Sequence, residues 1–108
     1  MADTRTPTEA ATDAPIACTL TPGEYADRIG ELAALAARAL RTREQTVDGE
    51  RLVFADSAAT ERQLRAVIAA EAGCCAFLRM DLQRTGEGLV LDVAGPHDAR
   101  PIIAELFA

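Results

Sequence analysis

Cys74 and Cys75 are adjacent in the segment Glu71-Ala-Gly-Cys-Cys-Ala-Phe77, and they are two of only three cysteines in the chain. Two neighbouring thiols can bind one soft metal ion, exchange a disulfide or close a strained vicinal bridge. Other reactive side chains are few: lysine is absent, which excludes Schiff-base chemistry, and the single serine, Ser57, precedes an expected helix. The cysteines are therefore the first candidates for a functional site.

The third cysteine, Cys18, lies in a short strand that the alternating residues 16–20 predict, with its side chain facing the core. In a ferredoxin-like arrangement this strand runs antiparallel beside the strand that begins near Phe77, so the end of one meets the start of the other. We therefore expect the sulfur atoms of Cys18, Cys74 and Cys75 to converge at one corner of the sheet.

Three thiolates at a protected corner would select Cu(I), Zn(II), Cd(II), Hg(II) or As(III) over hard cations such as calcium and magnesium. A structural zinc site needs four ligands, and the fourth would have to be His97, Glu71 or water. A two- or three-coordinate thiophilic ion therefore fits better. Glu71, one helical turn before the doublet, could accept protons or bond to a ligand from outside the metal's own coordination sphere.

Other interpretations stay open. A buried cysteine often acts only as a small apolar side chain, and His97, the one histidine, is expected in a solvated turn. A thiol-dependent redox or organometal-processing enzyme is an alternative, but the carboxyl end of a helix raises thiol pKa and opposes a reactive thiolate. A further alternative is a regulatory or oligomerisation module with structural cysteines, in which a sheet edge forms a homodimer.

The composition limits the class of protein and its partners. A chain of 108 residues with 49% hydrophobic residues has room for one domain. Its net charge of −6 argues against nucleic acid as a partner, and no apolar run is long enough for a membrane span. We expect residues 1–15 to be a disordered tail without signal-peptide features and residues 16–108 to form the domain, in the cytoplasm, with reduced thiols.

The first helix should begin after Thr21, with Pro22 at its first position and Glu24 completing a capping box, and run to about Arg41. Its opposite faces differ in polarity. The apolar stripe is predicted to contain Tyr25, Ile29, Leu32, Ala36 and Leu40, and the solvated face to contain Asp27, Arg28, Glu31 and Arg38.

Two hairpins and two more helices complete the pattern. Asp48-Gly49 predicts a turn between strands 44–47 and 51–55. Asp56, Ser57 or Thr60 should cap the next helix, whose buried stripe includes Leu64 and Ile68, and Gly73 should end it in a left-handed conformation. Strands 77–83 and 89–93 follow, joined by a turn at 86–88, and a short helix closes the chain over 102–107.

This order predicts an α+β fold, with a single antiparallel-rich sheet and helices on one face. Its first six elements match a ferredoxin-like βαββαβ unit, to which an extra strand and a C-terminal helix are added.

The segments Ile16-Ala-Cys-Thr-Leu20, Glu71-x-x-Cys-Cys-x-Phe77 and Ala104-Glu-Leu-Phe107 together resemble a group of small bacterial Cys-Cys proteins associated with heavy-metal regulators and mercury- or arsenic-resistance genes. The resemblance covers about residues 16–107. It implies a metal–thiol role and supplies no activity or substrate.

Overall fold

A computed structural model describes residues 22–74 and 77–108 of the chain. In these residues three α-helices accompany one four-stranded antiparallel sheet, which confirms the α+β class. The elements are α1 (Pro22–Ala39), β1 (Leu40–Gln45), β2 (Gly49–Phe54), α2 (Ala58–Cys74), β3 (Arg79–Thr85), β4 (Gly88–Ala94), the short 3-10 helix η2 (His97–Ala99) and α3 (Arg100–Glu105).

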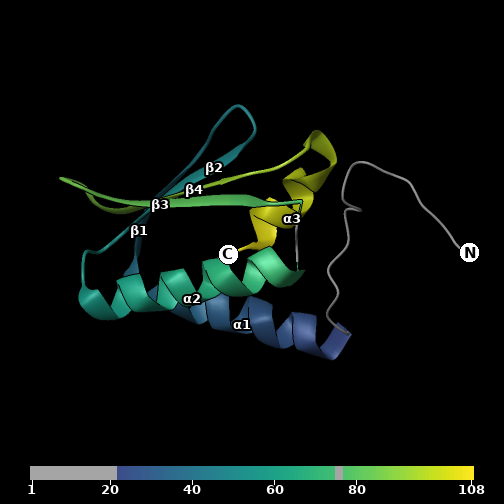
Figure 1. Cartoon of the computed structure of the whole chain (residues 1–108), viewed down its shortest axis with the longest axis horizontal. Helices are drawn as coiled ribbons and strands as arrows, with labels where there is room; N and C mark the ends of the chain where they lie inside the picture. Colours follow the sequence, from purple (N-terminus) through teal and green to yellow (C-terminus); the bar gives the residue numbers. More distant parts are fainter. Residues whose placement is uncertain (1–21, 75–76) are drawn as a thin grey trace, which may run out of the picture.

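The two long helices form a layer against one face of the sheet, and α3 closes one end of the space between them (Figure 1). α1 and α2 run antiparallel, since Arg28 of α1 contacts Glu71 near the end of α2, while Arg38 contacts Gln63 near its start. The helices therefore cover one face, as the sequence predicts. No helix of the described chain is long and apolar enough to cross a membrane.

Alternation along the central strands decides which face of the sheet is covered. Leu52 and Phe54 of β2 lie in the core, whereas Arg51 between the strand's buried residues is exposed. β4 likewise places Leu89, Leu91 and Val93 in the core, while Val53 and Val90 are buried on the other face, outside the core cluster. The remaining core residues come from the three helices and from Phe77, Ala99, Leu106 and Phe107. The main contributors are Leu32 and Leu35 of α1, Leu64 of α2, Leu89, Leu91 and Val93 of β4, and Ile103 of α3.

The strands lie in the order β1-β2-β4-β3, so β4 pairs with both β2 and β3. A ferredoxin-like order gives that central place to the first strand of the chain. Since β4 occupies it here, the ferredoxin-like order is not confirmed. The expected strand 16–20, the cap at Thr21 and the tail 1–15 lie outside the described residues.

Both hairpins form where turn chemistry predicts them, with strand ends displaced by a few residues. Gly88 adopts φ = 128°, and a Cβ atom there would stand 2.4 Å from the carbonyl oxygen of Phe54. At Gly49 a Cβ would stand 1.8 Å from the carbonyl oxygen of Val93. Glycine is therefore required at the start of both β2 and β4, because the neighbouring backbone passes too close for a side chain.

Two arginines hold α3 against the first hairpin through hydrogen bonds to backbone carbonyl groups. Arg43 of β1 forms an ion pair with the buried Glu50 and donates to the carbonyl oxygens of Ile103 and Ala104 at 3.2 and 3.1 Å. Arg100 donates to the carbonyl oxygens of Thr46 and Val47. These bonds satisfy carbonyl groups at the end of α3 and in the turn, and so hold the helix over the sheet.

After α3, the chain inserts an aromatic side chain into the core. Phe107 is buried and meets Phe54 edge to face, with ring centroids 5.4 Å apart. Its φ of 62° is a left-handed conformation that non-glycine residues rarely adopt, so the ring's burial offsets a backbone cost. The closing helix predicted over 102–107 is found two residues earlier, over Arg100–Glu105, so Leu106 and Phe107 lie beyond its end.

Two helix ends differ from the sequence prediction. α1 ends at Ala39, two residues before Arg41, because the chain enters β1 at Leu40. The prediction that Gly73 ends α2 in a left-handed conformation is wrong, since α2 continues through Gly73 to Cys74. A glycine can stay helical at a modest cost where packing of the rest of the helix favours it.

Ser57 is the residue that caps α2. Its Oγ accepts the backbone N–H of Thr60 at 3.0 Å, the bond expected between an N-cap residue and the third helical position. Of the three predicted capping residues, Ser57 therefore has this role. The side-chain hydroxyls of Ser57 and Thr60 are also bonded, at 2.9 Å.

Replacing Ser57 by alanine should lower the free energy of unfolding by about 1 kcal/mol, because the first turn of α2 loses its acceptor. Urea unfolding followed by circular dichroism measures the change. Ser57→Asp keeps an acceptor at the helix start and serves as the matched control. Equal losses in both variants would contradict the capping role.

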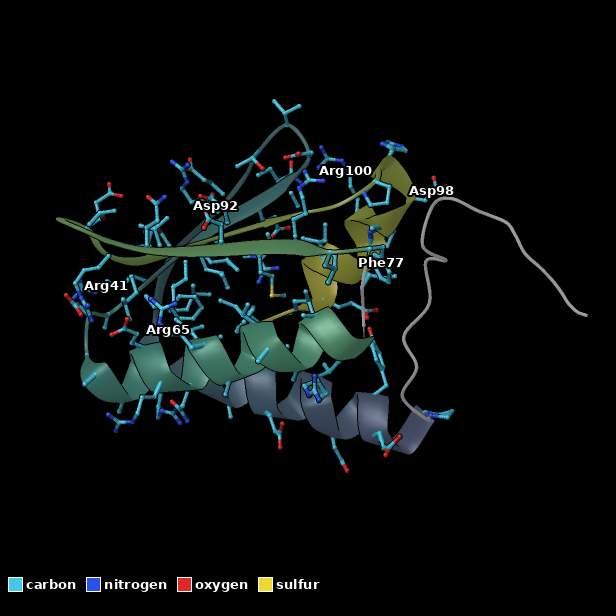
Figure 2. All side chains as sticks on the ribbon, in the orientation of Figure 1. Arg41, Arg65, Phe77, Asp92, Asp98 and Arg100 are labelled. Atoms are coloured by element: carbon cyan, nitrogen blue, oxygen red, sulfur yellow. The ribbon has the colours of Figure 1, made fainter. Side chains whose placement is uncertain are left out.

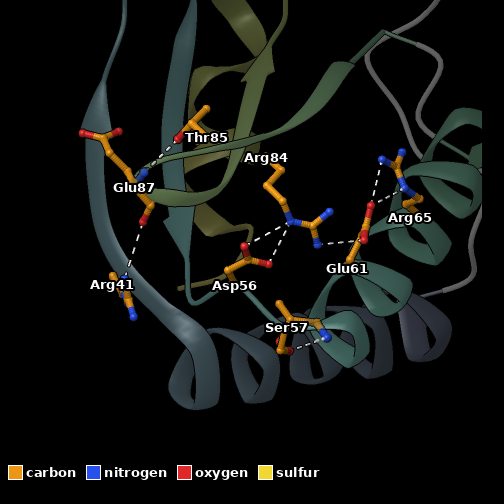
Figure 3. A network of polar contacts seen from close by, with 9 residues as sticks. Arg41, Asp56, Ser57, Glu61, Arg65, Arg84, Thr85 and Glu87 are labelled. Atoms are coloured by element: carbon orange, nitrogen blue, oxygen red, sulfur yellow. Dashed lines mark hydrogen bonds and ion pairs between the residues drawn. The ribbon is translucent and has the colours of Figure 1, made fainter.

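Arg84 at the end of β3 connects the sheet to the start of α2 (Figure 3). Its guanidinium bonds to Asp56 at 3.0 Å and to Glu61 at 2.9 Å, and Glu61 also accepts from Arg65. The hydrogen bond from Arg84, then that from Arg65, lowers the pKa of Glu61 from its ordinary value of 4.5. The ionised carboxylate is thus favoured in the folded protein.

A group whose pKa is lowered on folding contributes stability above its unfolded pKa, and this contribution is lost as pH falls through the folded pKa. We expect Glu61→Gln to destabilise the protein at neutral pH and to have little effect well below pH 4.5, where Glu61 is protonated. Urea unfolding over that pH range measures the difference. In an Arg84→Gln background the effect of Glu61→Gln should shrink, and a difference that is constant with pH would refute this account.

Candidate functional site

The cysteine doublet lies at the end of α2. Cys74 is the last residue of that helix, whereas Cys75 and Cys18 lie outside the described residues. The expected convergence of three sulfur atoms therefore stays a prediction. What the structure does describe is the surroundings: the last turns of α2, the start of α1, and the chain from Phe77 onward.

Glu71 is buried three residues before Cys74, with only 4% of its surface exposed. Its Oε2 accepts a hydrogen bond from Nη1 of Arg28 on α1, at 2.5 Å. Glu71 lies three residues after Ile68 and so continues the buried stripe predicted for this helix, and its carboxylate is shielded from solvent. Glu71 thus joins the two long helices next to the doublet.

Arg28 corrects the sequence prediction for α1. We expected it on a solvated face, but its side chain is only 20% exposed and pairs with Glu71. A carboxylate near the carboxyl end of a helix is unfavourable, and the last turn of α2 carries no basic residue of its own. Arg28 supplies the missing positive charge from the neighbouring helix. Helical periodicity predicts the direction in which a side chain points, but it does not predict which residues of a neighbouring helix lie opposite that side chain.

His97 is exposed at the start of η2, as expected for a solvated turn. Its loop nevertheless packs close to the segment that follows the doublet. A Cβ on Gly95 would stand 3.4 Å from both the carbonyl oxygen of Phe77 and Cδ2 of Leu78. Figure 2 shows Phe77 and Asp98 at the same end of the molecule, so the structure brings the loop that carries His97 to the end of the sheet where β3 begins.

A second contact near this end joins α1 to α3. The hydroxyl of Tyr25 donates to Oε1 of Glu105 at 2.7 Å. Tyr25 was predicted on the apolar stripe of the first helix, and Glu105 was not identified from the sequence. The hydroxyl group of Tyr25 was the one available signal for this contact, since a half-buried tyrosine usually finds a polar partner.

Cys74 lies at the carboxyl end of α2, and this position affects the chemistry expected of its thiol. The carboxyl end of a helix carries partial negative charge, which favours a positive ion and disfavours an unbound thiolate. Among residues 22–74 and 77–108, no group of three or more histidine, cysteine or acidic side chains is placed to hold a metal. A site of this kind would have to include residues outside that part of the chain, as the predicted set with Cys18 and Cys75 does.

Comparison with known proteins adds no assignment: no family model, no curated protein and no solved structure matches this chain.

We expect Glu71→Ala to lower the free energy of unfolding by about 2 kcal/mol, because the ion pair between Glu71 and the partly buried Arg28 is lost. Urea unfolding with reduced thiols measures the loss. Arg38→Ala is the control at the other contact between α1 and α2, since its bond to Gln63 is exposed and its loss should cost about 0.5 kcal/mol or less. In a double-mutant cycle, additive effects of Glu71→Ala and Arg28→Ala would show that the pair is not coupled.

Proposed function

We propose that this protein is a cytoplasmic binding protein that captures a thiophilic metal or metalloid ion of the Hg(II), As(III) and Cu(I) class. Cys74 and Cys75 supply two thiolates, and Cys18 supplies the third. Soft ions of this class prefer sulfur ligands and accept low coordination numbers, which matches the three cysteines of the chain.

The observation that carries the proposal is the end of α2 at Cys74, three residues after Glu71, whose buried carboxylate pairs with Arg28. The pair fixes the end of α2 against α1, so the backbone at Cys74 starts from an anchored turn. A preorganised ligand loses less conformational freedom when the ion binds. Since the ion pair uses Oε2 of Glu71, Oε1 is the oxygen that would bond to a protonated or metal-bound ligand.

His97 has a lesser role in this proposal. Its loop packs near Phe77 and Leu78, two and three residues after Cys75, which makes it the nearest described imidazole to the doublet. An ion that requires four ligands, such as Zn(II), would need His97 or water to complete its sphere. A three-coordinate ion would leave His97 in solvent. Preference for Hg(II) or As(III) over Zn(II) therefore follows from the same residues.

Mass spectrometry under native conditions tests the proposal, with the reduced protein and one equivalent each of Hg(II), As(III), Cu(I) and Zn(II) in the presence of excess glutathione. We expect one ion of the soft class per chain. Tight binding should be lost in Cys74→Ser and in Cys75→Ser and weakened in Cys18→Ser. Glu71→Gln should reduce the affinity by about tenfold, as is typical for a group that supports metal ligands.

Met80→Leu is the matched control, because it removes a half-buried sulfur atom that is not a thiol and keeps the side-chain volume. Its affinity should equal that of the unchanged chain. Retention of tight binding in both Cys74→Ser and Cys75→Ser would refute the proposal and favour cysteines that only pack. Conversion of an organomercurial or a disulfide by the unchanged protein would instead favour the enzyme alternative.

A further inference from the structure

The outer face of the helix layer carries a feature that metal capture does not use. Between α1 and α2 lies an open groove of about 520 Å³ whose lining includes the exposed residues Ala34, Arg38 and Ala66. The groove is also lined by the apolar Leu32, Leu35 and Val67, by the small Ala70, and by the polar Arg28, Glu31 and Gln63. Small side chains such as alanine allow another helix to approach closely.

Charges are arranged along this face with one sign at each end. Asp27, Glu31, Ala34 and Arg38 follow at spacings of four, three and four residues, which places them in one row along α1. The acidic end of the row is Asp27 and Glu31, and the basic end is Arg38. Two like charges four residues apart destabilise a helix by about 0.2–0.5 kcal/mol. A partner helix whose charges run in the opposite order, with basic residues facing Asp27 and Glu31 and acidic ones facing Arg38, would stabilise this row.

These charges have little compensation within the part of the chain that the structure describes. Asp27 and Glu31 make no hydrogen bond or ion pair there, and Arg38 bonds only to the neutral amide of Gln63. Gly30, beside this row in the middle of α1, is exposed, and a Cβ atom there would meet nothing within 4 Å. A mid-helix glycine costs about 1 kcal/mol relative to alanine. The described fold gives no packing reason for it, whereas close approach of another helix would.

We propose that a second copy of this chain packs on this face, related by a twofold axis that crosses α1 at Ala34. Such an axis places α1 of one copy antiparallel to α1 of the other. Glu31 of each copy then faces Arg38 of the second copy, because the two residues lie on either side of Ala34 at nearly equal spacing. The Glu31–Arg38 ion pair therefore forms twice by symmetry, as an isologous interface requires.

The available surface sets the strength of this dimer. α1 and α2 have 18 and 17 residues, and so lengths of about 27 and 26 Å. Two such helices side by side offer roughly 500 Å² per copy, or about 1,000 Å² in all, at the lower end for specific interfaces. A reversible dimer with a micromolar dissociation constant is therefore expected, and it does not depend on the proposed metal binding.

Sedimentation velocity of the full chain, with reduced thiols and no added metal, tests this interface from about 1 µM to 1 mM. The mass should rise from 11.4 kDa toward twice that value. Glu31→Arg and Arg38→Glu should each raise the dissociation constant by about tenfold or more, because each places like charges opposite one another at two positions. The double variant Glu31→Arg/Arg38→Glu should restore dimerisation, since it reverses both pairs.

Ala34→Glu should abolish the dimer by placing two carboxylates together at the axis, and circular dichroism would verify that each variant is folded. Glu44→Arg on β1 and Asp81→Arg on β3 are the matched controls, because both are exposed on edge strands away from the helix layer. They should leave the dissociation constant unchanged. A chain that stays monomeric, a double variant that does not recover, or dimer loss in either control would overturn the proposal.

Discussion

The placement of all the helices on one face of the sheet determines where every other element lies. The opposite face carries the Arg51–Asp92 ion pair next to Val53 and Val90, which are buried but lie outside the main core cluster. The face that the helices cover contributes Leu52 and Phe54 of β2 and Leu89, Leu91 and Val93 of β4 to the core. With so few aromatic residues in the chain, that face is covered mainly by leucines, isoleucine and alanines of α1, α2 and α3, together with Phe107. The helices must therefore lie side by side on the same face, which brings the end of α2 against α1 and leaves their outer surfaces exposed.

Side-by-side packing creates an electrostatic requirement at the end of α2. The carboxyl end of a helix is partially negative, and Glu71 adds a buried carboxylate to it. Arg28 of α1 offsets this charge through its ion pair with Glu71. The end of α2 at Cys74 is thus held against α1 by a contact between opposite charges. Under the proposed function, a bound cation would stabilise the ionised thiols there, because metal ligation requires deprotonated cysteines.

Local patterns in the sequence were sufficient for much of this fold. Asp48-Gly49 located the first hairpin, Ser57 was among the predicted caps, and the stripe through Leu64 and Ile68 located α2, because each depends on neighbours within a few residues. The central position of β4 could not be predicted in this way, since strand order depends on contacts between distant segments. Arg28 was assigned to solvent for the same reason. For the candidate site, the sequence identified Glu71 as a residue next to the doublet but not Arg28, the partner that neutralises it.

The proposed metal site and the proposed dimer interface together determine how many ions a dimer of this chain can bind. An antiparallel pairing of α1 about Ala34 also reverses α2, so the doublet of one copy and that of the other lie at opposite ends of the interface. Their separation is then close to the length of α2, about 26 Å, which no single ion can bridge. Each copy must therefore bind its ion independently, giving one ion per chain in monomer and dimer alike. A stoichiometry of one ion per two chains would require a different interface, in which the ends of α2 meet.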